Sequence, residues 1–134
     1  AASYGGIDIS PYLPWIQSSL DFFDEHYRML ARKRGARELD GNGKLVIYPG
    51  SGAETFKMAY NPTATAAGLK VVTSHLIDYL RQHQADTATV ARYEKMLNTW
   101  PDLAFRQVAG HRVLAPAVTW ERDGVTWIRS SSSL

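Results

Sequence analysis

The chain has 134 residues, 45% of them hydrophobic and 21% charged, which is the length and composition of one globular domain. Its 15 lysines and arginines against 13 acids give a net charge of +2, which does not require a nucleic-acid or membrane partner. The absence of cysteine excludes disulfides, thiol catalysis and thiolate metal sites. No apolar run reaches the roughly 20 residues of a membrane span, and the N-terminal residues do not have the pattern of a signal peptide.

The first predicted element is a helix that begins at Ser10 and Pro11 and ends near Gly35. Serine is a common N-cap, proline suits the first turn, and glycine often follows the last turn. Apolar residues at spacings of three and four place one stripe on one helix face. The stripe consists of Leu13, Ile16, Leu20, Phe23, Tyr27 and Leu30.

Residues 38–56, ELDGNGKLVIYPGSGAETF, interrupt the helical pattern. The DGNG stretch predicts a turn, and residues 44–48 then read as a short strand with Leu45 and Ile47 on one side. Proline halts this strand, and the glycines that follow allow close backbone approach. We expect a β insertion at about 38–50.

Two further helices are predicted after this insertion. One begins near Asn61-Pro62-Thr63, and the other runs from Asp86 or Thr87 to Asn98. The stripe of the second helix comprises Leu69, Val72, Leu76, Tyr79 and His83, and the inner face of the third comprises Val90, Tyr93 and Leu97.

β-Hairpins are predicted after residue 103. One has its turn at Ala109-Gly110-His111, and another has its turn at Asp123-Gly124. Residues 130–134, which are serine-rich, are expected to form a flexible tail. The predicted fold class is therefore mainly α with short β-hairpins, in one domain or a fragment of a larger one spanning residues 1–134.

Motifs for several other chemistries fail on spacing. Gly43-Lys44 is followed by Leu45, where a phosphate-binding loop needs serine or threonine. The DGNG stretch resembles the start of a calcium loop, but positions six and twelve are Leu45 and Ser51 instead of glycine and glutamate. The four histidines have no metal-ligand spacing. We expect no metal and no cofactor.

A basic group lies at the end of the first helix. No aromatic residues interleave with it, and acids follow at once, so it is interpreted as a solvated helix end and not as a nucleic-acid surface. The group consists of Arg28, Arg32, Lys33, Arg34 and Arg37.

Glu54 is the main candidate for a catalytic or ligand-binding residue. It follows the glycine-rich corner and lies between Tyr48 and Tyr60 in the sequence. Aromatic rings stack on the apolar faces of sugars, and a carboxyl group in a partly apolar place has the raised pKa that a general acid requires. The alternative is a hairpin loop in which Glu54 only starts a helical turn.

Three sequence blocks carry a family resemblance: SLDFFDEHYRM, ELDGNGKLVIYPGSGAETFK and NPTATAAGLK. In this order they resemble large bacterial proteins with the six-hairpin (α/α)6 toroid of glycosidases, glycoside-hydrolase-like and distantly akin to the α-L-fucosidase group. The resemblance covers roughly residues 11–117. It implies helical hairpins around a central axis, a sugar pocket formed by loops at one end, and a secreted or periplasmic location.

The resemblance also implies roles for individual residues. Such glycosidases use two carboxylic acids, an acid and a base or nucleophile. Glu54 would be the acid or a sugar-binding carboxylate, and Asp40 a weaker second acid. The substrate-binding residues would be Tyr48, Ser51, Asn61 and Tyr60.

The chain departs from a complete toroid, which needs more helices, and the sequence after Trp120 does not continue the resemblance. We therefore expect a fragment that lacks activity alone and self-associates through exposed helix faces. Two function classes stay open. One is part of a glycoside hydrolase, and the other is a non-catalytic helical module that binds carbohydrate or a protein.

Overall fold

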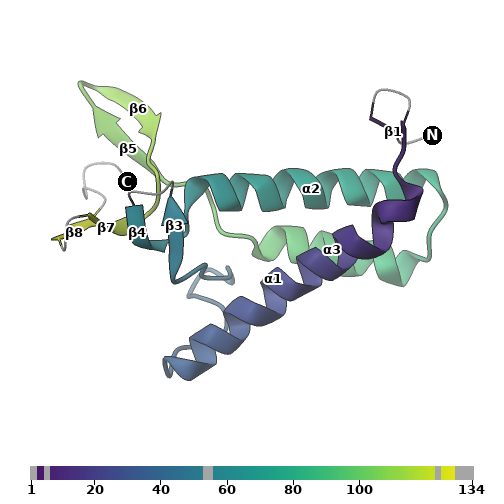
Figure 1. Ribbon diagram of the computed structural model, residues 1–134, viewed down its shortest axis with the longest axis horizontal. Helices are drawn as coiled ribbons and strands as arrows, with labels where there is room; N and C mark the ends of the chain where they lie inside the picture. Colours follow the sequence, from purple (N-terminus) through teal and green to yellow (C-terminus); the bar gives the residue numbers. More distant parts are fainter. Residues whose placement is uncertain (1–2, 5–6, 53–55, 123–124, 129–134) are drawn as a thin grey trace.

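The computed structural model describes residues 3–4, 7–52, 56–122 and 125–128. Three α-helices make up most of this part. The small antiparallel sheets lie toward one end of the helices, except for the two-stranded sheet near the N-terminus, which lies toward the other end (Figure 1). The helical segments are η1, a 3-10 helix (Ser10–Tyr12), α1 (Leu13–Lys33), α2 (Thr63–Gln82) and α3 (Thr87–Thr99). The prediction of a mainly helical chain with short β-hairpins is confirmed at this level. The predicted tail at 130–134 lies outside the described residues.

The strands form three antiparallel sheets. The largest has four strands in the order β3-β4-β7-β8, and its centre pairs β4 with β7, which lie far apart in the sequence. The two hairpins predicted after residue 103 are confirmed as β5–β6 and β7–β8. The strands are β1 (Ser3–Tyr4), β2 (Ile7–Asp8), β3 (Gly50–Gly52), β4 (Phe56–Tyr60), β5 (Phe105–Val108), β6 (His111–Leu114), β7 (Thr119–Arg122) and β8 (Val125–Ile128).

The predicted strand at 44–48 is wrong. That segment contains only an isolated bridge between Leu39 and Leu45, and the first strands of the insertion are β3 and β4, farther along the chain. The β insertion therefore does not lie at 38–50 as predicted.

The reason is the hydrogen bonding of this segment, which is divided among different neighbours. The Leu45 amide donates to the Thr99 carbonyl at 2.7 Å, whereas Ile47 bonds with Asn61. A ladder to one partner strand therefore does not form. The predicted alternation is nevertheless confirmed, since Leu45 and Ile47 are both fully buried.

The two ends of α1 differ in how well the sequence predicted them. Ser10 is not an N-cap of a long helix, because it lies in η1 and its hydroxyl donates to Asp8 at 2.9 Å. The C-terminal end follows the prediction: Gly35 has a φ of 74°, and the Ala36 amide donates to the Ala31 carbonyl at 2.9 Å. This is the Schellman arrangement, which needs a left-handed residue after the helix.

The core lies where α2 and α3 pack against each other and against α1 and the start of the insertion. Trp100 is fully buried in it, and its indole Nε1 donates to Thr73 Oγ1 at 2.8 Å. The Thr73 hydroxyl in turn donates to the Leu69 carbonyl at 2.6 Å. Among the described residues, every buried side-chain nitrogen and oxygen has a hydrogen-bond partner.

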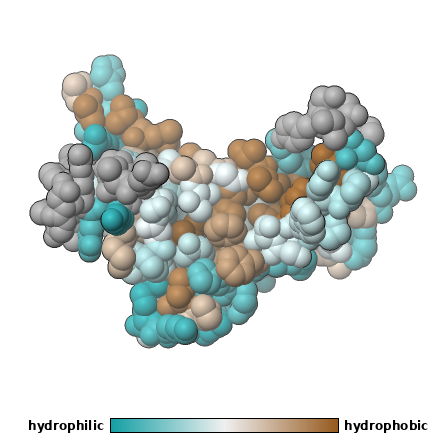
Figure 2. All heavy atoms as spheres, in the orientation of Figure 1, coloured by the Kyte–Doolittle hydropathy of each residue, from teal (hydrophilic) through white to brown (hydrophobic). Residues whose placement is uncertain are grey.

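The stripe predicted for α2 is partly wrong, because Val72 and His83 are exposed. Val72 instead borders an apolar groove of about 380 Å³ between α1 and α2, which Ile16, Phe23 and Leu69 also line. Figure 2 shows hydrophobic residues gathered on this visible face of the helices. Self-association through such a face stays a prediction, which sedimentation velocity at several concentrations would test. None of the described helices is long and apolar enough to span a membrane.

Candidate functional site

Two tyrosines predicted to contact substrate lie side by side at the base of the insertion. The rings of Tyr48 and Tyr60 are stacked, with centroids 4.0 Å apart and planes 20° apart. Arg34, just past the end of α1, lies over the Tyr48 ring at 5.1 Å and donates from Nη1 to the Tyr48 carbonyl at 3.0 Å. Both tyrosines are half-buried, so the pair forms a partly accessible aromatic surface.

Asn61, the third predicted contact residue, holds the base of the loop closed. The side-chain Oδ1 of Asn61 accepts a hydrogen bond from the backbone N–H of Ile47 at 2.8 Å. The backbone N–H of Asn61 donates to the Ile47 carbonyl at 2.9 Å. Its φ of 49° is in the left-handed region, which asparagine tolerates better than most residues. Its carboxamide oxygen is therefore engaged with the backbone next to Tyr48.

Asp40, the predicted second acid, organises a turn. Its Oδ1 accepts hydrogen bonds from the Asn42 amide at 2.8 Å and the Lys44 amide at 3.0 Å. This is the local role that aspartate commonly plays in turns. One oxygen of the carboxylate is thus committed to the backbone.

Ser51 and Glu54 complete the predicted set. Ser51 is exposed in β3, in the same insertion as Tyr48. Glu54 lies outside the described residues, and its proposed role stays a prediction. The structure therefore brings together Tyr48, Tyr60 and Asn61, and it gives Asp40 a structural task.

Besides Asp40, the insertion contains a second acid that the structure describes, Glu38, which lies at its start. Hydrogen bonds from Arg32, and then from Arg28, hold the pKa of the Glu38 carboxyl below its ordinary value. The group is therefore ionised at neutral pH and cannot act there as a proton donor. It ties the loop to the end of α1.

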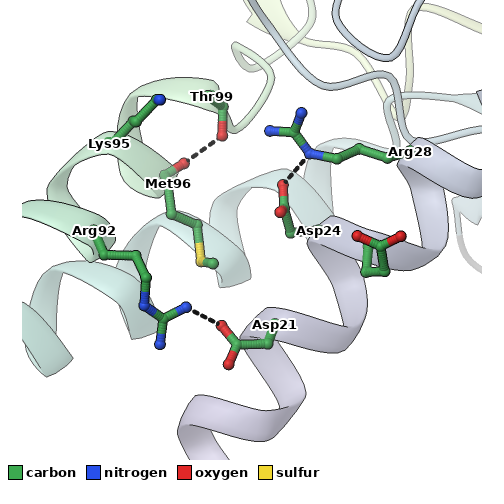
Figure 3. A pocket seen from close by; sticks show the side chains of 8 residues that line it. Asp21, Asp24, Arg28, Arg92, Lys95, Met96 and Thr99 are labelled. Carbon is green, nitrogen blue, oxygen red and sulfur yellow. Dashed lines mark hydrogen bonds and ion pairs between the residues drawn. The ribbon is translucent and has the colours of Figure 1, made fainter. Parts of the chain in front are cut away.

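A second concave surface, which the sequence did not predict, is a pocket of about 360 Å³ between α1 and α3. Figure 3 shows acids from α1 facing basic residues from α3 across it. Arg92 donates to Asp21 at 2.7 Å, and Arg28 donates to Asp24 at 2.9 Å. Lys95 also lines the pocket and forms no ion pair with a described residue.

The acids of this pocket are already paired. Besides Asp21 and Asp24, the pocket holds Glu25, which accepts a hydrogen bond from Arg32 at 3.1 Å. No carboxylate pair is therefore left free among the described lining residues. The pocket can hydrogen-bond a polar ligand. Its Arg92–Asp21 ion pair joins α3 to α1, whereas the pairs of the other two acids lie within α1.

Comparisons with known protein families, with curated proteins and with solved structures found no match to this chain. Within the described part of the chain, no group of three or more His, Cys, Asp or Glu side chains is arranged to hold a metal ion.

Proposed function

We propose that this chain forms a carbohydrate-binding part of a glycoside-hydrolase-like protein. The observation that carries the proposal is the stacked pair of Tyr48 and Tyr60 at the base of the insertion. The partly accessible rings offer an apolar platform for a sugar, and Ser51, exposed in β3 of the same insertion, is a candidate hydrogen-bonding group. The resemblance of the sequence blocks to six-hairpin glycosidases supports the same ligand class.

The proposal extends to the architecture of the parent protein. The consecutive helices α2 and α3 form a helical hairpin across the turn at 83–86, the kind of unit from which an (α/α)6 toroid is built (Figure 1). The insertion between α1 and α2 would be a wall of the sugar pocket. Further hairpins of the toroid would come from flanking sequence of the parent protein.

Hydrolysis of a glycosidic bond is the first form of the proposed function. Glu54 would donate a proton to the leaving oxygen, and a second carboxylate would activate water or attack the sugar carbon. A second form, non-catalytic sugar binding, is favoured by the state of the neighbouring acids. Glu38 is held ionised by two arginines and Asp40 is bonded to backbone amides, so neither is a free partner for Glu54.

Binding is tested first, by isothermal titration calorimetry with a panel of mono- and oligosaccharides. We expect one class of sugar to bind, and Tyr60→Ala to weaken that binding by about tenfold or more, since a stacked ring contributes on the order of 1 kcal/mol beyond its buried area. Tyr12→Ala is the matched control, because Tyr12 is an exposed tyrosine in η1 and outside the insertion. Absence of binding to every sugar of the panel would contradict the proposal.

Turnover is tested separately, by release of reducing ends from the sugar that binds, using the longest form of the parent protein that can be expressed. Glu54→Gln is expected to abolish turnover and to leave the melting temperature unchanged. Glu94→Gln, an acid on α3 paired with Arg81, is the control and should retain activity. Binding without turnover in the unsubstituted protein would select the non-catalytic form.

A further inference from the structure

The β5–β6 hairpin, which we call the ribbon, is a two-stranded sheet of its own. Figure 1 shows it extending away from the three helices. Its turn has positive φ angles at both central residues, 51° at Ala109 and 78° at Gly110, as a tight type I′ hairpin requires. An isolated two-stranded hairpin is at best marginally stable in water, and a third strand or a covering layer stabilises it.

The ribbon exposes aliphatic side chains. Val108 is 45% exposed, Val113 36% and Leu114 57%. Figure 2 shows hydrophobic residues along the ribbon, which is unusual on a projecting element surrounded by solvent. A partner that covered these side chains would remove apolar area from water.

The hydrogen-bond register shows which backbone groups are free. In an antiparallel pair, hydrogen-bonded and non-bonded residue pairs alternate. The Ala115 amide donates to the Ala104 carbonyl at 2.8 Å, so the next bonded pairs are Arg106 with Val113 and Val108 with His111. The residues between them direct their backbone N–H and C=O groups outward. On β6 these are Arg112 and Leu114.

The free edge of β6 is a template for another strand. Among the described strands, β6 pairs with β5 alone, so its other edge has no strand beside it. Strand addition to such an edge is a common mode of peptide recognition, in which the backbone bonds supply affinity and the side chains supply specificity.

Charge determines which strand fits. No aspartate or glutamate occurs between residues 103 and 120, whereas Arg106, His111 and Arg112 are all in the ribbon. Arg106 and His111 form no ion pair with a described residue, and the Arg112 guanidinium lies 3.9 Å from the centroid of the Phe105 ring. The ribbon is therefore positively charged, and no acid in the described part of the chain forms an ion pair with it.

This charge argues against two other occupants. A second copy of the ribbon would bring a second set of basic side chains close to the first, and neighbouring like charges across strands are destabilising. A nucleic acid gains affinity from many phosphate contacts, whereas the ribbon offers two arginines beside three exposed aliphatic residues that phosphates cannot use.

We propose that the free edge of β6 binds an extended acidic peptide segment of a partner protein, which adds to the ribbon as a third strand. Its acidic side chains lie on the face of the ribbon that carries Arg112, and its alternate, apolar side chains lie on the opposite face beside Val113. This interaction is independent of sugar binding by the insertion.

The probe is a synthetic, fluorescein-labelled nine-residue peptide of alternating valine and glutamate, followed by fluorescence anisotropy. We expect saturable binding that weakens by about tenfold or more when lysine replaces each glutamate. Leu114→Pro removes an outward N–H that the ribbon itself does not use, and should weaken binding to a similar degree. Gln107→Pro makes the same change on the β5 edge, and this matched control should bind as the unsubstituted chain does.

Arg112→Glu leaves the backbone donors in place and should also weaken binding by about tenfold, so the test does not depend on a proline variant that fails to fold. Amide spectra of Val108 and His111 report whether each variant keeps the hairpin. Equal binding of the glutamate and lysine peptides would overturn the proposal. So would dimerisation of the chain that Leu114→Pro abolishes, or binding of a 20-base-pair DNA duplex in place of the acidic peptide.

Discussion

The α2–α3 hairpin and the strands that follow it are stabilised in different ways. The hairpin encloses Trp100, whose indole N–H is satisfied by Thr73, and its contacts join neighbouring segments of the chain. The four-stranded sheet depends instead on pairing between β4 and β7, and the ribbon projects with exposed side chains on both strands. The helices therefore supply most of the buried core, whereas the ribbon leaves many of its side chains exposed.

The strongest way to test this comparison is to remove the largest buried side chain of the helical part. Trp100→Ala should lower the free energy of unfolding by about 3 to 5 kcal/mol, because it leaves a cavity and removes buried apolar area. Trp15→Ala is the matched control, since Trp15 is 74% exposed on α1 and its loss should change stability by less than about 0.5 kcal/mol. Urea denaturation followed by circular dichroism measures both. Similar losses in the two variants would contradict the view that Trp100 anchors the core.

A smaller effect is expected when only the acceptor for the indole is removed. Thr73→Val keeps the volume of the side chain but leaves the buried Trp100 N–H without a partner, at a cost of about 1 to 3 kcal/mol. Thr73→Ser keeps the hydroxyl and loses one methyl group, so it should cost only about 0.8 kcal/mol. If the serine variant were the less stable of the two in urea denaturation, packing and not the hydrogen bond would account for the role of Thr73.

The insertion can be perturbed where Gly50 lies against the ring of Pro62. A Cβ atom at Gly50 would lie 2.7 Å from Cγ of Pro62, so Gly50→Ala should destabilise the packing of β3 on the start of α2, by about 1 to 2 kcal/mol. Gly41→Ala is the control, because a Cβ at Gly41 meets nothing within 4 Å. Thermal unfolding compares the two variants, and sugar titration shows whether the Tyr48–Tyr60 pair is displaced. An unchanged Gly50→Ala variant would mean that the insertion tolerates movement relative to α2.

The smallest effect concerns the start of α3 and depends on pH. Hydrogen bonds from the Thr89 hydroxyl and the Ala88 amide lower the pKa of the Asp86 carboxyl below its ordinary value of 3.8. Because the folded-state pKa is depressed, the stabilisation is present above pH 3.8 and is lost as the pH falls through the lower folded-state value. Thermal melts should therefore show a difference between the unsubstituted chain and Asp86→Ala at pH 5 that shrinks toward pH 2.

Thr89→Val serves as the control for this effect, since it removes the hydroxyl that contributes most and leaves the amide donor. It should show a weaker pH dependence than the unsubstituted chain. A stability difference for Asp86→Ala that stays constant between pH 5 and pH 2 would contradict the role of the ionised carboxylate.

The sequence was sufficient for elements whose signals are local. Gly35 marks the end of α1, Asp86 caps α3, and the turn at Ala109-Gly110 marks the ribbon, because each depends on a few adjacent residues. The stripe of α2 was predicted less well. Val72 lies on the predicted face, but the neighbouring helix does not cover it.

The sequence was insufficient where partners come from distant segments. Leu45 and Ile47 alternate as in a strand, yet their backbone groups bond to Thr99 and Asn61, so burial was predicted correctly and pairing was not. The charged pocket was missed for the same reason. Asp21 is only an acid off the apolar stripe of α1 until Arg92, 71 residues later, lies opposite it.

Of the candidate site, the sequence indicated that Tyr48 and Tyr60 lie on either side of the glycine-rich corner, and the Ile47–Asn61 hydrogen bonds bring the residues next to them together. The tasks of Asn61 and Asp40 could not be predicted, because their side chains bond to backbone groups whose direction only the fold determines. The assignments of Glu54, Asp40, Ser51 and the tyrosines to a sugar stay predictions.

The paired hydrogen bonds between Ile47 and Asn61 have a practical consequence. They join the chain just before Tyr48 to the residue just after Tyr60, so the two tyrosines are fixed relative to each other by hydrogen bonds that lie outside their rings. A substitution on either ring can therefore change a ligand contact while these bonds still hold the two segments together.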